Sequence, residues 1–125
     1  MMRRLSTPVA MLRRVVLPLV MLGIAASAWP LSIREMRALE KSDPKQGASY
    51  VQYYLIGAVE GAIEAHAQAV RSGAKPQFCL NGRALDPRRA KGLVDAELRR
   101  NPGVYEADMP VELVVMNALA NSYPC

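Results

Sequence analysis

The segment from residue 48 to residue 72 limits the possible folds more than any other part of the chain. At 100° per residue, small side chains gather on one side of this helix and aliphatic side chains on another. The remaining charged stripe is narrow and consists of Tyr53, Glu60, Glu64 and Arg71. A helix that is apolar over most of its circumference is predicted to lie at the centre of a helical bundle. We expect Gly73 to end it.

Two glycines, Gly57 and Gly61, lie inside this helix. Each costs about 1 kcal/mol relative to alanine in a helix interior, so we expect a neighbouring helix to approach closely there. The same spacing occurs in membrane helix pairs. Polar residues along the segment, such as Gln52, His66 and Gln68, argue against a membrane span.

Two more helices are indicated by their start signals. Ser32 and Glu35 have the capping-box spacing, which predicts a short helix over about 33–41. Asp86 followed by Pro87 combines an N-cap residue with proline at the first helical position. The sequence therefore predicts a third helix, which begins at residue 86 and ends at the "RRNPG" turn.

A fourth helix is predicted from about Asp108 to Ala120, with Pro110 tolerated in its first turn. Its inward side is expected to carry Leu113, Met116 and Ala120. No segment shows the alternating pattern of a strand. The predicted fold class is therefore all-α, a small four-helix bundle-like domain.

Residues 1–28 have the three-part form of a secretory signal peptide. Four arginines precede an apolar run over 15–26, and small residues at 26–28 predict cleavage after Ala28. That run has 12 residues, whereas a membrane helix needs about 20. We therefore predict a periplasmic domain over residues 29–125, with no stable membrane span after cleavage.

The basic charge of the chain belongs largely to the predicted signal peptide. The whole chain has a net charge of +5, and four of its 16 basic residues lie in the first 28 residues. The predicted mature domain then has 12 basic and 11 acidic residues, a net charge of +1. Nucleic acid is therefore not an expected partner.

The two cysteines, Cys79 and Cys125, are predicted to form a disulfide. Cys79 precedes the third helix and Cys125 follows the fourth, so an antiparallel hairpin brings them together. A structural zinc needs about four ligands, more than this chain offers, and a Cys-x-x-Cys redox motif is absent. An intermolecular bridge is the alternative. In the chain-entropy model, closing such a loop contributes about 4 kcal/mol.

No catalytic, cofactor or metal site is predicted. His66 lies on the aliphatic side of the long helix and is expected to be a partly buried structural residue. Glu97 falls on the inner side of the third helix, where we expect it to reach solvent near the helix end; a half-buried carboxylate paired with arginine is the alternative. A basic cluster around that helix is expected to be a solvated face rather than an acidic-partner or lipid-headgroup surface: Arg83, Arg88, Arg89, Lys91, Arg99 and Arg100.

Three elements together, "YYLIGAVEG", "FC" and "ELVVMNALANSYPC", resemble the Rap/Tai immunity proteins of type VI secretion over residues 50–125. The resemblance implies an exported helical domain with a disulfide that neutralises a cell-wall amidase effector by binding it, often as a homodimer. It also implies that the following residues, with the two cysteines, determine the fold: Tyr54, Gly57, Gly61, Phe78 and Pro124. At Glu97 the family pattern leads us to expect an apolar or aromatic residue.

The predicted function is partner binding without catalysis. The "NPGVYEAD" connection is the predicted contact surface, because Tyr105 offers an aromatic anchor flanked by the acidic Glu106 and Asp108. An ordinary helical connection is the alternative at this position. For the whole protein, the alternatives are a periplasmic acid-stress chaperone of the HdeA type and a helical interaction domain without an effector.

Overall fold

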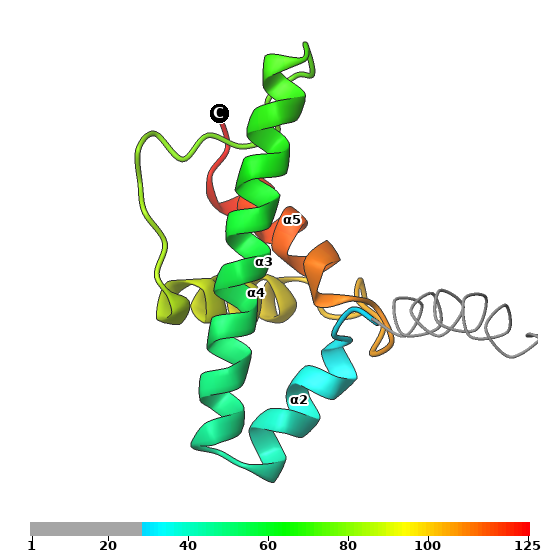
Figure 1. Cartoon of the computed structure of the whole chain (residues 1–125). Helices are drawn as coiled ribbons and strands as arrows, with labels where there is room; N and C mark the ends of the chain where they lie inside the picture. The colour runs from blue at the N-terminus through cyan, green and yellow to red at the C-terminus, as the bar shows by residue number, and fades with distance from the viewer. Residues whose placement is uncertain (1–28) are drawn as a thin grey trace, which may run out of the picture.

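The computed structural model describes residues 29–125, so the predicted signal peptide lies outside the described residues. Four helices occur in this range and are labelled as in Figure 1. They are α2 (Ile33–Ser42), α3 (Gln46–Arg71), α4 (Pro87–Arg100) and α5 (Val111–Ser122). Between residues 29 and 125 the backbone forms no strand, only one isolated bridge between Ser32 and Pro110. The all-α prediction is confirmed.

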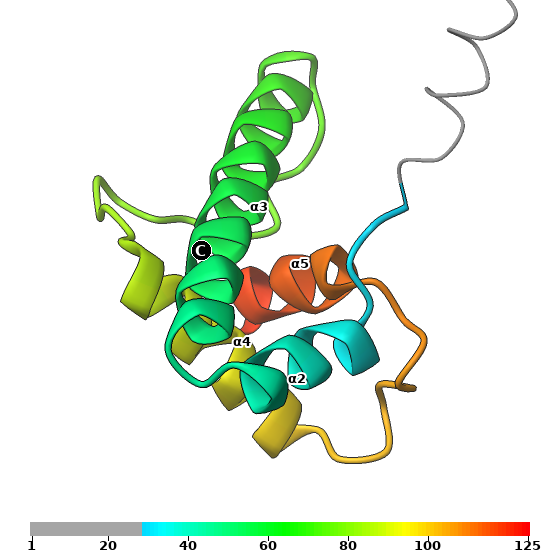
Figure 2. The same cartoon turned by 60° about the horizontal axis from the view of Figure 1, so that its bottom comes forward.

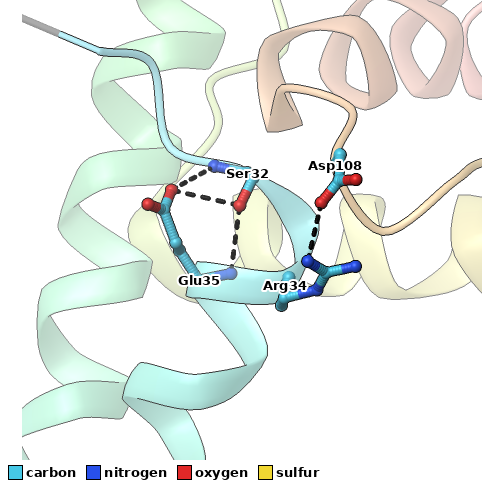
Figure 3. A network of polar contacts seen from close by, with 4 residues as sticks. All are labelled: Ser32, Arg34, Glu35 and Asp108. Carbon is cyan, nitrogen blue, oxygen red and sulfur yellow. Dashed lines mark hydrogen bonds and ion pairs between the residues drawn. The ribbon is translucent and has the colours of Figure 1, made fainter.

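The start of α2 contains the predicted capping box. The Ser32 Oγ accepts a hydrogen bond from the Glu35 backbone N–H at 3.1 Å, and Oε2 of Glu35 accepts from the Ser32 N–H at 2.9 Å (Figure 3). Two of the free N–H groups at the helix start are thereby satisfied. The sequence signal at this position was sufficient because the interaction is local.

Helix α3 is the long axis of the domain, and α2, α4 and α5 all pack against it (Figures 1 and 2). The apolar core forms where the four helices meet. Its fully buried larger side chains are Ile33, Met36, Val51, Leu55, Val59, Val94, Val111, Val114, Val115 and Leu119. Every helix therefore contributes to one core, as expected for a small domain.

Only the N-terminal half of α3 lies at the centre of the bundle. Val51, Leu55 and Val59 are fully buried, whereas no residue from Glu60 to Arg71 is buried. In Figure 1 this second half extends beyond the other helices. The prediction of a helix at the centre of the bundle is therefore confirmed for the first half of α3 only. Because the other helices are shorter, they cover only part of its apolar surface.

The close approach of two helix backbones occurs at Gly47 and not at Gly57 and Gly61, where it was predicted. A Cβ at Gly47 would lie 2.0 Å from the carbonyl oxygen of Leu39 in α2. At Gly57 and Gly61, both exposed, a Cβ would meet no atom within 4 Å. The expectation of a neighbouring helix at these two positions is therefore wrong. The tight turn between α2 and α3 places the close approach at the start of α3 instead.

The C-terminal end of α3 is covered by the segment that follows it. Gly73 ends the helix with φ of +103°, a conformation that favours glycine. The chain then returns along α3, and the ring of the buried Phe78 stacks on His66 with centroids 3.9 Å apart. The predicted disulfide between Cys79 and Cys125 is present, and the Cys79 N–H donates to the Tyr123 carbonyl at 2.8 Å.

Helix α5 begins three residues later than predicted. Pro110 is its N-cap in extended conformation and does not lie in the first turn. The Ala107 and Met109 carbonyls accept hydrogen bonds from the start of α2, and the Met109 N–H donates to the Glu106 carbonyl, so residues 106–109 form a turn before the helix. Leu113, predicted to face inward, is 43% exposed.

Candidate partner-binding site

The connection from residue 101 to residue 110 joins α4 to α5 and is fixed at both ends (Figure 2). At its start, the Asn101 N–H donates to the Glu97 carbonyl at 3.2 Å. At its end, the Val111 N–H donates to the Leu31 carbonyl at 2.9 Å. A loop held in this way can present side chains to a partner at little cost in conformational entropy.

The second half of the connection is anchored on α2. The N–H groups of Ile33 and Arg34 donate to the carbonyls of Met109 and Ala107 at 3.0 and 2.9 Å. These are N–H groups at a helix start, which have no partner within the helix. The Arg34 guanidinium also pairs with Asp108 at 2.9 Å, as Figure 3 shows. Both side chains are exposed, so this ion pair contributes little to stability.

A buried polar cluster lies under the first half of the connection. Glu97 of α4 is only 3% exposed. Its Oε1 accepts hydrogen bonds from the Tyr105 hydroxyl at 2.7 Å and from Nδ2 of Asn121 at 3.1 Å. The Tyr105 hydroxyl in turn accepts from Nδ2 of Asn117 at 3.0 Å. Tyr105 is thus held between α4 and α5.

The structure therefore corrects the sequence-based expectations for Glu97. It is buried, and no arginine within residues 29–125 forms an ion pair with it. Neutral donors from the connection and from α5 satisfy its carboxylate. A buried carboxylate requires such donors because an unpaired one is costly. Glu97 can replace an apolar residue here because Tyr105 and Asn121 are both in place.

The surroundings of Tyr105 favour the protonated form of its hydroxyl. Burial raises the pKa of Tyr105 above its ordinary value, and the hydrogen bond to Glu97 raises it further. Asn117 acts in the opposite direction. The phenol therefore serves as a neutral hydrogen-bond donor to Glu97 throughout the physiological pH range.

The three residues predicted to contact a partner differ in their surroundings. Tyr105 is half-buried, packs against the core and uses its hydroxyl internally. Asp108 is exposed but paired with Arg34. Glu106 is exposed, as is Val104 at 58%. The exposed part of the connection is thus its tip, while Tyr105 supports the tip from below.

A second polar contact links α3, α5 and the chain before α2. The Tyr54 hydroxyl donates to Oε1 of Glu112 and accepts from the Leu31 N–H at 3.1 Å. Burial raises the pKa of Tyr54, and the hydrogen bond to Glu112 adds to this. Tyr54 thereby connects three segments that are far apart in sequence.

Several members of these clusters were not identified from the sequence: Asn117, Asn121 and Glu112. Asn117 and Asn121 are four residues apart on α5, so they lie on one side of that helix. This spacing, next to an inward Glu97 on α4, was the available signal. Glu112 carried no signal, because its partner Tyr54 is 58 residues away.

The other polar residues singled out from the sequence have structural surroundings. His66 is half-buried, and its Nε2 accepts a hydrogen bond from the Gln77 N–H at 3.0 Å. Lys91 is not part of an open basic face, because it pairs with Asp95 at 2.5 Å and Glu40 at 3.2 Å. The Arg83 guanidinium lies over the Tyr123 ring, 5.4 Å from its centroid. The exposed Pro124 follows Tyr123 after the end of α5.

Two properties of residues 29–125 bear on the type of site. No three His, Cys, Asp or Glu side chains in this range are grouped so that they could hold a metal ion. None of the four described helices is long and apolar enough to cross a membrane.

A comparison with protein families connects this fold to a known group. The family model described as Rap1a immunity proteins matches residues 32–125. The chain belongs to the Rap1a immunity protein family. The match includes both cysteines, the Glu97 cluster and the whole connection between α4 and α5. Searches of curated proteins and of solved structures returned no match.

Proposed function

We propose that this protein is exported to the periplasm and neutralises a cell-wall amidase effector of type VI secretion by binding it. The family membership over residues 32–125 carries this proposal. The disulfide supports it, because disulfides persist in oxidising compartments such as the periplasm. Export would use residues 1–28 as a signal peptide, with cleavage after Ala28. The protein acts by occlusion and has no catalysis of its own.

We place the effector contact on the tip of the connection between α4 and α5. Val104 and Glu106 are exposed there, and the cluster of Tyr105, Glu97 and Asn117 beneath them holds the backbone. An exposed apolar residue beside an acidic one on a rigid loop is suited to enter a partner's cleft. Asp108 contributes at the edge of this surface through its pair with Arg34.

The test is to ask whether a cell-wall amidase is encoded beside this gene and whether the purified protein inhibits it. Val104→Asp and Glu106→Arg are expected to weaken inhibition about tenfold or more, as for central interface residues. Leu113→Asp is the matched control, because Leu113 is also an exposed apolar residue but lies on α5. Unchanged inhibition in both loop variants would contradict the proposal that this loop contacts the effector.

Two substitutions at Tyr105 distinguish direct contact with the effector from support of the loop. Tyr105→Ala removes both the ring and the hydroxyl, whereas Tyr105→Phe removes only the hydrogen bonds with Glu97 and Asn117. We expect both substitutions to lower affinity, with the larger loss for alanine. Unchanged affinity in Tyr105→Ala contradicts any role for this residue. Failure to bind any amidase, with protection of other proteins from aggregation near pH 3, would favour the chaperone alternative.

A homodimer, which the family resemblance implies, stays a prediction. The exposed side of α3 at Gly57 and Gly61 has space for the backbone of a second copy. Sedimentation velocity over a range of protein concentrations measures the oligomeric state directly. A single species with the mass of one chain at every concentration contradicts the dimer.

A further inference from the structure

The short arm before α2, residues 29–32, is attached to the rest of the domain almost to its first residue. The Leu31 N–H donates to the Tyr54 hydroxyl at 3.1 Å, and the Leu31 carbonyl accepts a hydrogen bond from the first N–H of α5 at 2.9 Å. The Ser32 N–H donates to Oε2 of Glu35 at 2.9 Å. The backbone of the arm is therefore fixed to within two residues of its first position.

The Glu35 carboxylate beside this arm has one oxygen without a donor. The Ser32 N–H and Oγ both donate to Oε2 (Figure 3). These hydrogen bonds lower the pKa of Glu35, so the carboxylate is ionised at neutral pH. Within residues 29–125, Oε1 accepts no hydrogen bond, and the neighbouring Arg34 pairs with Asp108 instead. The charge of Glu35 is therefore open to a cation placed next to it.

Trp29, at the start of the arm, lies close to this carboxylate. Trp29 and Glu35 together line a groove of about 520 Å³ between α2 and α3, and together they line a second cavity of about 220 Å³. Three residues separate the backbone nitrogens of Trp29 and Ser32, which limits their distance to at most about 11 Å. Pro30 also restricts the backbone of Trp29 to extended conformations. The Trp29 nitrogen is therefore held in the neighbourhood of Glu35.

Cleavage after Ala28, as proposed above, turns this nitrogen into an α-amino group. Such a group is largely protonated at neutral pH, because its ordinary pKa is about 8. We propose that the α-ammonium group of Trp29 donates to Oε1 of Glu35 and thereby fixes the first residues of the mature protein. The inference rests on the proposed cleavage but not on any effector. In the uncleaved chain the same nitrogen is an uncharged amide, so processing itself completes the attachment of the arm.

A second carboxylate, that of Asp108, also borders the smaller cavity beside Trp29. Its charge is already compensated, because Oδ1 lies 2.9 Å from the Arg34 guanidinium (Figure 3). Glu35 has no such cation among residues 29–125. The α-ammonium group therefore gains more from Glu35 than from Asp108.

A displaced N-terminus tests the pairing. The protein is produced from the full-length gene and purified in its exported, disulfide-bonded form. A variant carries Ala-Pro-Pro between Ala28 and Trp29, and this stiff extension moves the α-ammonium group by about 9 Å. Hydrogen exchange of the Leu31 N–H reports opening of the arm, because this group donates to Tyr54 and not to Glu35. Its protection factor is expected to be about two- to threefold lower in the insertion variant, the scale of an exposed ion pair.

Glu35→Gln is the central variant, because glutamine also forms the capping box and lacks the charge. In this background the insertion should no longer change the protection of Leu31. Asp108→Asn is the matched control, since it removes the carboxylate that is already paired with Arg34. In that background the insertion should lower the protection as it does in the unsubstituted protein.

Three results would overturn the proposal. The first is equal protection of Leu31 with and without the insertion, and the second is a difference that survives in Glu35→Gln. The third is an intact mass showing that the exported protein does not begin at Trp29. None of these measurements involves an amidase. Failure of this inference is therefore distinguishable from failure of the proposed inhibition.

Discussion

The two halves of α3 belong to one continuous helix but are stabilised in different ways. Residues 46–59 contribute Gly47, Val51, Leu55 and Val59 to the buried interior, where α2, α4 and α5 converge. Residues 60–71 contribute no buried residue. The second half is instead covered by the returning segment, through the stacking of Phe78 on His66. The first half is thus held by helix packing, whereas the second half combines the core contacts of Ala62 and Ile63 with the cover of a loop.

This difference shows what an amphipathic pattern can and cannot indicate. Small and aliphatic side chains run along the whole of α3, although its charged residues, Glu60, Glu64 and Arg71, all lie in the second half. Whether that surface is buried depends on the length and direction of the other helices. The disulfide between Cys79 and Cys125 attaches the returning segment to the end of α5. It therefore substitutes for helix packing beside the second half of α3.

Removing the disulfide is expected to have the largest effect and to increase the difference between the halves. The double variant Cys79→Ser, Cys125→Ser should lose about 4 kcal/mol of unfolding free energy, measured by urea denaturation. Hydrogen exchange should show residues 60–71 losing protection before residues 46–59, because the segment covering them is released. Uniform loss of protection along α3 would contradict the claim that its two halves are stabilised in different ways.

Truncation of an aliphatic residue in each half tests the burial directly. Leu55→Ala, at a fully buried position, should cost about 3 kcal/mol. Val70→Ala, at a half-buried position, should cost less than about 1 kcal/mol. Both values come from chemical denaturation of the oxidised protein. Equal costs would show that the second half is packed as tightly as the first.

Alanine at two glycines should give effects of opposite sign. Gly47→Ala places a Cβ against the Leu39 carbonyl and should cost about 2 kcal/mol, because backbone must move. Gly57→Ala meets no atom and should stabilise by up to about 1 kcal/mol, the difference in helix propensity. Thermal unfolding of both variants measures the difference. A destabilised Gly57→Ala would indicate a close partner on that side of α3, such as a second copy.

The smallest expected effect concerns the alkaline stability of the first half. The pKa of Tyr54 is raised in the folded state, so the folded protein holds this proton more tightly than the unfolded chain. This stabilisation is fully present below the unfolded pKa of about 10 and is lost as pH rises through the folded value. Tyr54→Phe should therefore flatten the loss of unfolding free energy between about pH 9 and pH 11. Tyr53→Phe, at an exposed position of the same helix, is the control and should leave the slope unchanged.

The proposed binding loop shows the same limit of sequence analysis. Its position between two helices could be predicted from "NPG", and Tyr105 could be selected as its aromatic residue. That Tyr105 turns inward depends on Glu97 in α4 and Asn117 in α5, which become neighbours only when the two helices pack. Asp108 is paired with Arg34, 74 residues earlier in the chain. Neither contact has a local sequence signal.

The sequence by itself determined the features that depend on neighbouring residues or on chain connectivity. These are the helix starts at Ser32 and Asp86, the end of α3 at Gly73, and the pairing of the two cysteines across a helical hairpin. The tertiary structure alone decided which parts of α3 are buried, where two helices come into close contact, and how Glu97 is satisfied. The physical reason is that local hydrogen bonds and backbone preferences act over a few residues. Burial and polar pairing arise between segments that the folded chain brings together.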